Sequence, residues 1–181
     1  MAPRPRPIWP DGNARIRHAA GLLFLFPREG HAHIVLTVRA ETLGRHKGQV
    51  SLPGGVIEPG EAFEQAALRE AHEEISLPPA GTHILGALSP IDIPVSGFRL
   101  HPIVGVSDRA PVLTPADGEV ARILEIAVED LLAPGTVVIT ERQRDGLRIE
   151  VPAFRLGTDE IWGATAMVLA EFLVVLGWRG P

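Results

Sequence analysis

The sequence predicts an α/β fold in which a mixed β-sheet is flanked by helices. Two observations support this class: strand-like stretches recur along most of the chain, and a few helix-like stretches interrupt them. The 181 residues have the length of one domain, and 45% hydrophobic with 22% charged residues is ordinary for a globular protein. We therefore expect a single domain over residues 14–181, preceded by a Pro-rich irregular arm at residues 1–13.

The first half of the chain predicts a hairpin, a glycine-rich loop and a long helix. Residues 19–26 and 31–39 are strand-like, and the Pro-Arg-Glu-Gly sequence at 27–30 is typical of a turn between them. Residues 40–60 contain five glycines and two prolines, which favours loop or very short strands. Residues 61–75 lack both residue types and are rich in Ala, Glu and Leu, so they predict a helix that two later prolines end.

The second half predicts further strands and two helices. An Asp-Gly dipeptide between residues 136–141 and 147–154 indicates a hairpin. Asp159 can cap a last helix that runs to about Leu176. This helix is apolar almost all round, so it is either deeply packed or part of a subunit contact, as in a homodimer. The other elements expected are strands at 82–88, 98–106 and 121–127 and a short helix at 129–132.

Composition and charge exclude several classes of protein. Lys and Arg number 17 against 22 Asp and Glu, and the net charge of −5 has the wrong sign for binding nucleic acid through its phosphates. The chain has no cysteine, which excludes disulfides, thiolate metal sites and a cysteine nucleophile. The apolar run at residues 19–26 is too short to span a membrane, and no signal-peptide cleavage site follows it. We expect a cytoplasmic protein that binds neither nucleic acid nor membrane.

The helix predicted at residues 61–75 carries three carboxylates on one face. Glu70, Glu73 and Glu74 stand at i, i+3 and i+4, within an arc of about 100°. Like charges at this spacing destabilise a bare helix by about 0.2–0.5 kcal/mol per pair, and these lie at the edge of an apolar face. A hard divalent cation with oxygen ligands would compensate the charge. A solvated acidic stripe is the alternative interpretation.

The residues before and within this helix favour the metal interpretation. A set of residues with fixed spacing runs through this segment: Gly55, Glu61, Arg69, Glu70, Glu73 and Glu74, with Leu77 in a closing aliphatic position. Residues 55–77 thereby resemble the Nudix box, the signature of hydrolases that act on nucleoside diphosphates linked to another group. The resemblance implies an α/β/α sandwich around a mixed sheet, with Mg²⁺ or Mn²⁺ held by the box helix. The departure is Ser76, which stands where the family has Gly, after the helix, where a left-handed conformation is common.

A narrower resemblance surrounds the box. Residues 36–55, LTVRAETLGRHKGQVSLPGG, resemble the extended signature of coenzyme A pyrophosphatases, with Leu52 in place of the usual Phe. Residues 94–105 and 161–169 are also similar to that subfamily. The resemblance implies a metal-dependent pyrophosphohydrolase that cleaves the diphosphate of coenzyme A, or of a derivative, to 3′,5′-ADP and 4′-phosphopantetheine. Its partner would be this small nucleotide-diphosphate substrate.

The resemblance also implies metal ligands and catalytic groups. Glu70 and Glu74 are the main expected ligands, with Glu73 as a third ligand or one acting through water, and Gly55 offering its carbonyl. We expect Glu73, Glu74 and Glu119 to be catalytic, with Glu119 reaching the site from a late loop as general base. An ordinary exposed carboxylate is the alternative for Glu119.

Basic and polar residues near the box are candidates for holding the substrate. Those expected to do so are Arg39, His46, Gln49 and Arg99. Surface charge without function is the alternative for each arginine, and His46 is either substrate-facing or structural. Arg69 is expected to pair with Glu61 rather than to touch substrate. Trp162 and Phe172 are expected in the core rather than in an adenine-binding platform.

Two alternatives to this function stay open at the level of the sequence. One is a pyrophosphatase with the same box that acts on NADH, ADP-ribose or nucleoside triphosphates; residues 36–55 argue against it. The other is a catalytically silent module that binds a nucleotide and regulates a partner; the intact box carboxylates argue against it. Mg²⁺-dependent turnover of any pyrophosphate separates these two classes.

Overall fold

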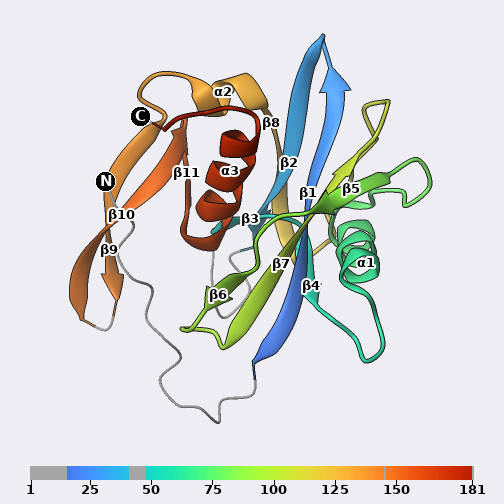
Figure 1. The fold of residues 1–181 in the computed structure, drawn as a ribbon, viewed down its shortest axis with the longest axis horizontal. Coiled ribbons are helices and arrows are strands. Elements are labelled where there is room, and N and C mark those ends of the chain that lie inside the picture. The colour runs from blue at the N-terminus through green and yellow to red at the C-terminus, as the bar shows by residue number, and fades with distance from the viewer. Residues whose placement is uncertain (1–15, 41–47, 145, 181) are drawn as a thin grey trace.

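The computed structural model describes residues 16–40, 48–144 and 146–180, which form two β-sheets and three helices (Figure 1). The strands of the larger sheet are β1 (Arg17–Arg28), β2 (His31–Arg39), β3 (Val50–Ser51), β4 (Gly54–Val56), β5 (His83–Ala87), β6 (Ile91–Ile93), β7 (Phe98–Val106) and β8 (Val120–Ala127). The smaller sheet contains β9 (Val137–Arg144), β10 (Leu147–Leu156) and β11 (Asp159–Trp162). The helices are α1 (Phe63–Ile75), α2 (Val128–Leu132) and α3 (Gly163–Val175). The arm expected at residues 1–13 lies outside the described residues.

The larger sheet is mixed and is built around β1. Strand β1 pairs antiparallel with β2 and parallel with β7, in the order β3-β2-β1-β7-β5, while β4, β6 and β8 pair with β1, β7 and β2. Strands β1 and β2 are continuous apolar runs because both faces of the sheet are covered at this point. The hairpin predicted from the first half of the sequence is confirmed, and so is the α/β class.

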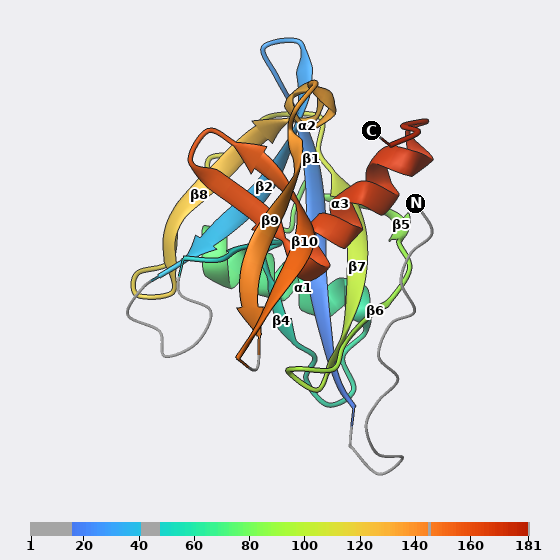
Figure 2. The same ribbon diagram turned by 90° about the vertical axis from the view of Figure 1, so that its left-hand side faces the viewer.

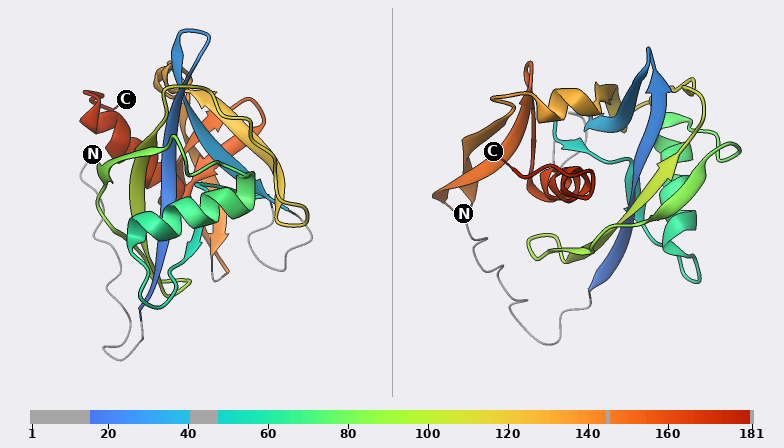
Figure 3. Two further views of the ribbon diagram at one scale, coloured as in Figure 1. Left: turned by 90° about the vertical axis from the view of Figure 1, so that its right-hand side faces the viewer. Right: turned by 45° about the horizontal axis from the view of Figure 1, so that its top comes forward.

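Helices cover both faces of the larger sheet (Figure 3). Helix α1 packs on one face through Ala66, Ala67 and Ala71, whose small side chains let the helix approach β1 closely. Helix α3 covers the other face and lies between the two sheets, where its buried residues join one core with β2 and β10 (Figure 2). Each face of the sheet therefore has a core of its own, and the expected α/β/α arrangement is confirmed.

Helix α3 is deeply packed along most of its length. Val168, Leu169 and Leu173 are almost fully buried, whereas Val174 and Val175 are exposed in its last turn. The apolar character of this helix is thus explained by burial in the core, and the homodimer stays a prediction. Within the described ranges, no helix combines the length and the apolar character needed to cross a membrane.

The last helix begins later than the sequence predicts. The four residues from Asp159, expected as its first turn, form strand β11, and α3 starts at Gly163. Arg122 on β8 forms an ion pair with Asp159, and Arg155 on β10 donates to Glu160 at 2.6 Å. These contacts between distant segments, together with the ladder to β10, favour a strand, and no local sequence pattern reveals them.

Helix α1 ends where the motif predicts, although it begins at Phe63 rather than at residue 61. Its C-cap Ser76 adopts the left-handed conformation, with φ 56° and ψ 27°. The Ser76 N–H donates to the carbonyl of His72 at 2.9 Å, and the Leu77 N–H to that of Ala71 at 3.3 Å. A residue with a Cβ pays about 1 kcal/mol for this conformation relative to glycine, so the departure from the family pattern costs stability but keeps the turn.

Candidate active site

The start of α1 is fixed by an arginine and a glutamate. Arg69 Nε donates to Glu61 Oε1 at 2.8 Å, and a terminal nitrogen of Arg69 donates to Glu61 Oε2 at 3.0 Å. The same guanidinium donates to the carbonyl of Val56 at 3.1 Å, so it ties the helix to the end of β4. Bidentate pairing of this kind fixes geometry as well as adding energy. The pairing of Arg69 with Glu61 that the sequence predicts is confirmed.

Strand β4 lies between β1 and α1, and its first two residues, Gly54 and Gly55, have no side chains. A Cβ at Gly54 would collide with the backbone of β1 at Ala20, and a Cβ at Gly55 would collide with the carboxylate of Glu70. The Gly54 N–H donates to Glu74 Oε2 at 3.2 Å. The backbone of β4 therefore lies close to Glu70 and Glu74 of α1. Gly54 is required by the β1 backbone, and a side chain at Gly55 would displace the Glu70 carboxylate.

Glu74 has an electrostatic environment unlike that of an ordinary surface carboxylate. Its pKa is raised to about 7, chiefly because burial disfavours the charged form and also because the charges of Glu70 and Glu119 are near. The Gly54 hydrogen bond and the positive charge of Arg39 oppose this rise. A cation bound beside Glu74 would stabilise its ionised form, as the metal interpretation requires.

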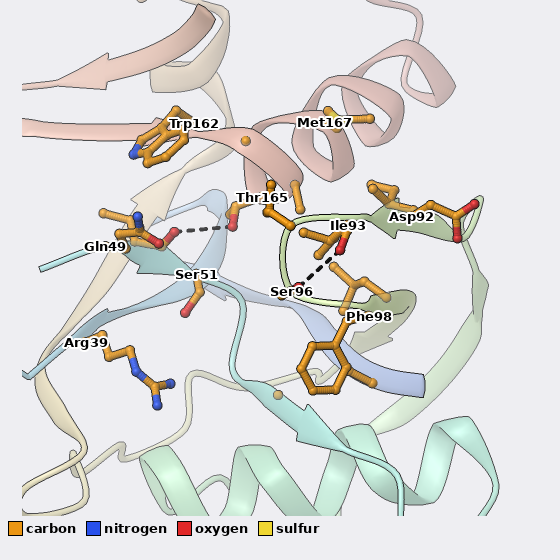
Figure 4. Close-up of a pocket in the computed structure, with 18 of the residues that line it drawn as sticks. Arg39, Gln49, Ser51, Asp92, Ile93, Ser96, Phe98, Trp162, Thr165 and Met167 are labelled. Carbon is orange, nitrogen blue, oxygen red and sulfur yellow. Dashed lines mark hydrogen bonds between the residues drawn. The ribbon is translucent and has the colours of Figure 1, made fainter. Parts of the chain in front are cut away.

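These groups lie in one cleft of about 1370 Å³. Its carboxylate wall consists of Gly55, Glu70, Glu74 and Glu119. Its apolar wall comes from β6, β7 and their connection and consists of Ile93, Val95, Phe98 and Leu100. Its tryptophan wall comes from the smaller sheet and consists of Arg142, Gln143 and Trp162. Figure 4 shows Trp162 and Phe98 on opposite sides of the pocket, with Ser51 between them.

Glu119 reaches the cleft on a loop that is anchored to α1. The Thr114 N–H donates to the carbonyl of Ile75 at 3.0 Å, and the Ala116 N–H donates to that of Glu74 at 2.8 Å. The carbonyl of Glu119 accepts from the Ala40 N–H at 2.9 Å, which ties the loop to the end of β2 as well. The structure thus places Glu119 beside Glu74, although 45 residues separate them in the chain. Its catalytic role stays a prediction.

The third box carboxylate lies apart from the other two. Glu73 is 56% exposed, accepts a hydrogen bond from Arg69 at 3.3 Å, and does not line the cleft. Glu70 also accepts from Arg69, at 2.9 Å. Among the described residues, no three His, Asp or Glu side chains gather as a ready metal site. Arg69 therefore holds Glu70 and Glu73 by hydrogen bonds, whereas Glu74 has none from this arginine among the described contacts.

The carboxylate wall nonetheless fits Mg²⁺ or Mn²⁺ by its chemistry. It offers hard oxygen donors on Glu70, Glu74 and Glu119, and burial, with the nearby charges of Glu70 and Glu119, raises the pKa of Glu74. Gly55 presents only backbone to the same place, because any side chain there would displace Glu70. The residues that would hold a metal are therefore Glu70 and Glu74, with Glu119 adjacent; the ligand roles of Glu73 and of the Gly55 carbonyl stay predictions.

The four candidate substrate residues have different positions. Arg39 and Gln49 line the cleft. A register shift between Val38 and Arg39 at the end of β2 separates Arg39 from the regular ladder, and such bulges re-aim side chains next to functional sites. Arg99 does not line the cleft; its guanidinium donates to Asp92 at 2.6 and 3.1 Å. His46 lies outside the described residues.

Sequence reasoning missed the tryptophan wall. The sequence predicts Trp162 as a core residue of the last helix, and this is wrong. Trp162 is a half-buried residue of β11 that lines the cleft. Phe172 is 5% exposed and belongs to the core, as expected. Arg142, whose guanidinium lies 5.1 Å from the Trp162 ring, carried no motif at all. The resemblance of residues 161–169 to the subfamily was the available signal for Trp162, but the helix expected there concealed it.

Comparison with known proteins assigns the family. The NUDIX domain matches residues 15–143. Relatives named "Uncharacterized Nudix hydrolase NudL" include that of Citrobacter koseri, 31% identical over 170 residues (93% of this chain and 88% of the relative), and that of Yersinia enterocolitica, 34% identical over 158 residues (87% and 80%).

Solved structures agree with this assignment. The Nudix hydrolase RenU from M. smegmatis has a TM-score of 0.56 and 25% identity, covering 66% of this chain and 78% of that one. A MutT/nudix family protein from Enterococcus faecalis, at 17% identity, supports the fold alone, with a TM-score of 0.59 over 90% of this chain and 63% of that one. The protein whose box helix, glycine strand and cleft are described above belongs to the Nudix hydrolase family.

Proposed function

We propose that this protein is a metal-dependent pyrophosphohydrolase that cleaves the diphosphate of coenzyme A or a derivative. The observation that carries the proposal is the convergence of three segments on one cleft. Residues 36–55 supply Arg39 and Gln49, residues 94–105 supply Phe98 and Leu100, and residues 161–169 supply Trp162 and Met167. These are the segments whose sequences resemble coenzyme A pyrophosphatases, and they line the same cleft as the carboxylate wall.

The size and lining of the cleft support a substrate with two unlike halves. Pockets for drug-sized ligands occupy about 300–1,000 Å³, and this cleft, at about 1370 Å³, is larger. Coenzyme A joins a nucleotide to a long, neutral pantetheine arm through its diphosphate. Trp162 and Phe98 lie on opposite sides of the cleft (Figure 4), and the carboxylate wall lines the same cleft, where it can receive the diphosphate that joins the two halves.

The reaction is the attack of water on one phosphorus of the diphosphate. The P–O bond between that phosphorus and the bridging oxygen breaks. The bridging oxygen leaves with the other phosphate, and the attacked phosphorus keeps the oxygen of the water. A bound Mg²⁺ or Mn²⁺ supplies charge neutralisation and lowers the pKa of water. Glu70 and Glu74 would hold it, Glu119 takes a proton from the attacking water, and Arg39 pairs with a phosphate oxygen.

A panel of diphosphates tests the proposal. The protein is incubated with Mg²⁺ or Mn²⁺ and, separately, with coenzyme A, acetyl-coenzyme A, dephospho-coenzyme A, NADH, ADP-ribose and ATP, and the products are identified by mass spectrometry. We expect the highest kcat/KM with a coenzyme A species, release of 3′,5′-ADP and 4′-phosphopantetheine, and a lower value for dephospho-coenzyme A. Preference for NADH or ADP-ribose would overturn the substrate, and no turnover of any diphosphate would favour the silent module.

A further inference from the structure

Trp162 presents an aromatic surface to the cleft from a rigid position. It is the last residue of β11, where it pairs with Ala153 of β10. Three residues on, the Thr165 hydroxyl donates to the carbonyl of Val50 at 3.2 Å. The ladder on one side and this buried hydrogen bond on the other fix Trp162 relative to β3. A half-buried tryptophan held in this way loses little conformational entropy when a ligand covers it.

Arg142 stacks on this tryptophan and adds positive charge. Its guanidinium lies 5.1 Å from the ring centre, donates to Glu160 at 2.5 Å and to the Thr140 hydroxyl at 3.0 Å. Arg155 shares Glu160, at 2.6 Å. Two guanidinium groups share one carboxylate, so Glu160 does not fully neutralise Arg142, which lines the cleft. An aromatic ring with an adjacent fixed arginine is a surface that a phosphorylated nucleoside fits.

The apolar wall has a second aromatic residue but a different chemistry. The guanidinium of Arg17 lies 4.0 Å from the Phe98 ring centre and donates to the Ser96 carbonyl at 2.9 Å. The Asp92 carboxylate lines the cleft on this side and offsets the charge of Arg99. Most other neighbours are aliphatic. The aliphatic lining of this wall suits a neutral arm.

One short segment of chain contacts both the tryptophan wall and the carboxylate wall. The carbonyl of Val50 accepts the Thr165 hydroxyl at 3.2 Å, and the Gly54 N–H, four positions further on, donates to Glu74 Oε2 at 3.2 Å. Trp162 and Glu74 line the same cleft. A purine stacked on Trp162 can therefore direct its diphosphate along this cleft toward Glu74.

We infer that Trp162 is the platform on which the adenine ring of the substrate stacks, with Arg142 beside the 3′-phosphate and the pantetheine arm on the apolar wall. The adenine site stands on the geometry of the tryptophan wall alone. The placement of the arm and of the 3′-phosphate rests on the proposed function. The inference replaces the core role that the sequence predicts for Trp162.

Binding of products without turnover tests the platform. Calorimetry with the full chain measures Kd for adenosine 3′,5′-bisphosphate and for 4′-phosphopantetheine in the parent and in Trp162→Leu, Trp162→Phe and Phe98→Leu. Base stacking is worth about 1–3 kcal/mol, so Trp162→Leu should weaken the nucleotide about 5- to 150-fold and leave phosphopantetheine unchanged. Trp162→Phe should restore most of the affinity, and Phe98→Leu should show the reverse selectivity.

The arginine has its own test. Arg142→Gln should weaken adenosine 3′,5′-bisphosphate more than ADP, because only the former carries the 3′-phosphate. Equal losses for both nucleotides would remove the 3′-phosphate from the inference while the adenine site stands or falls on Trp162.

A direct contact measurement covers the case in which Trp162→Leu does not fold. In the parent, nuclear Overhauser effects are expected between the adenine protons and indole protons that disappear in Trp162→Phe. Folded Trp162→Leu with unchanged nucleotide Kd, or a bound nucleotide without these contacts, overturns the inference. If NADH or ADP-ribose proves the better substrate while Trp162→Leu still weakens adenine nucleotides, the coenzyme A proposal fails and the adenine platform stands.

Discussion

The carboxylate wall and the tryptophan wall of the cleft are held together in different ways. Most of the carboxylate wall comes from one stretch of chain, in which β4 contacts α1 through Gly54 and Glu74. The tryptophan wall comes from a separate sheet, and ion pairs such as that between Arg142 and Glu160 join its strands. The residues that would hold the metal are therefore positioned by local spacing, whereas substrate recognition depends on pairing between distant segments. The two can change independently.

The largest loss of activity should come from substitutions in the carboxylate wall, at Glu70 and Glu74. Glu74→Gln and Glu70→Gln should each lower kcat about a thousandfold, or about 4 kcal/mol, because each removes an oxygen ligand of the expected metal. Glu74→Gln should not lower the Tm, since the amide relieves the repulsion of Glu74 by Glu70 and Glu119. Glu70→Gln relieves the same repulsion but loses the ion pair with Arg69, so its Tm should stay near that of the parent. Turnover at limiting Mg²⁺ and thermal unfolding are measured together, with exposed Glu64→Gln of the same helix as control. Near-parental activity of either variant would refute the metal assignment.

Glu119 tests whether the anchored loop belongs functionally to the carboxylate wall. Glu119→Gln should lower kcat at least about tenfold, a loss of about 1.4 kcal/mol of transition-state stabilisation. Asp117→Asn and Glu125→Gln are controls for general acidity: neither residue lines the cleft, and Glu125 forms an ion pair with Arg28. Steady-state rates at saturating substrate measure the effect. Small, equal effects of all three changes would place the base among the box glutamates.

Arg39, which lines the cleft, and Arg99, which does not, allow a direct comparison of two candidate substrate-binding arginines. Arg39→Gln should raise KM about tenfold with little change in kcat, because a phosphate contact made equally in ground and transition states affects binding alone. Arg99→Gln should raise KM less than threefold or so, because Asp92 already neutralises that guanidinium. Initial rates over a range of substrate concentrations decide. A larger effect at Arg99 would move the phosphate site toward β6 and β7.

The smallest effect is expected at Ser76, outside both walls. Ser76→Gly should raise the free energy of unfolding by about 1 kcal/mol, since glycine adopts the left-handed conformation without a Cβ clash. For a chain of this size that corresponds to a Tm increase of about 2–4 °C. Ser76→Ala should bring no such gain, and kcat should stay unchanged in both. Calorimetric melting curves are the measurement, and a lower Tm for the glycine variant would contradict the cap interpretation.

Local patterns in the sequence predicted the parts of the fold that local interactions determine. The hairpin of β1 and β2 and the helix that carries Glu70 and Glu74 follow from turn residues and residue spacing. The convergence of Glu119 on the box was predicted from the family resemblance and from no local pattern. The positions of Asp159 and Trp162 could not be predicted in this way, because β11 has only four residues and depends on partners in β8 and β10. No local pattern predicted the place of Arg142 either, because its contact with Trp162 joins β9 to β11.

The loop that carries Glu119 is positioned by its backbone, largely independently of which side chains it carries. The hydrogen bonds that tie it to α1 and to the end of β2 come from main-chain groups, at Thr114, Ala116 and the carbonyl of Glu119 itself. Substitutions on this loop that preserve its backbone leave those attachments in place. Selection can therefore exchange the side chains beside the box carboxylates, one residue at a time, without having to rebuild the support beneath them. The loop is a place where new reaction chemistry can arise on an unchanged scaffold.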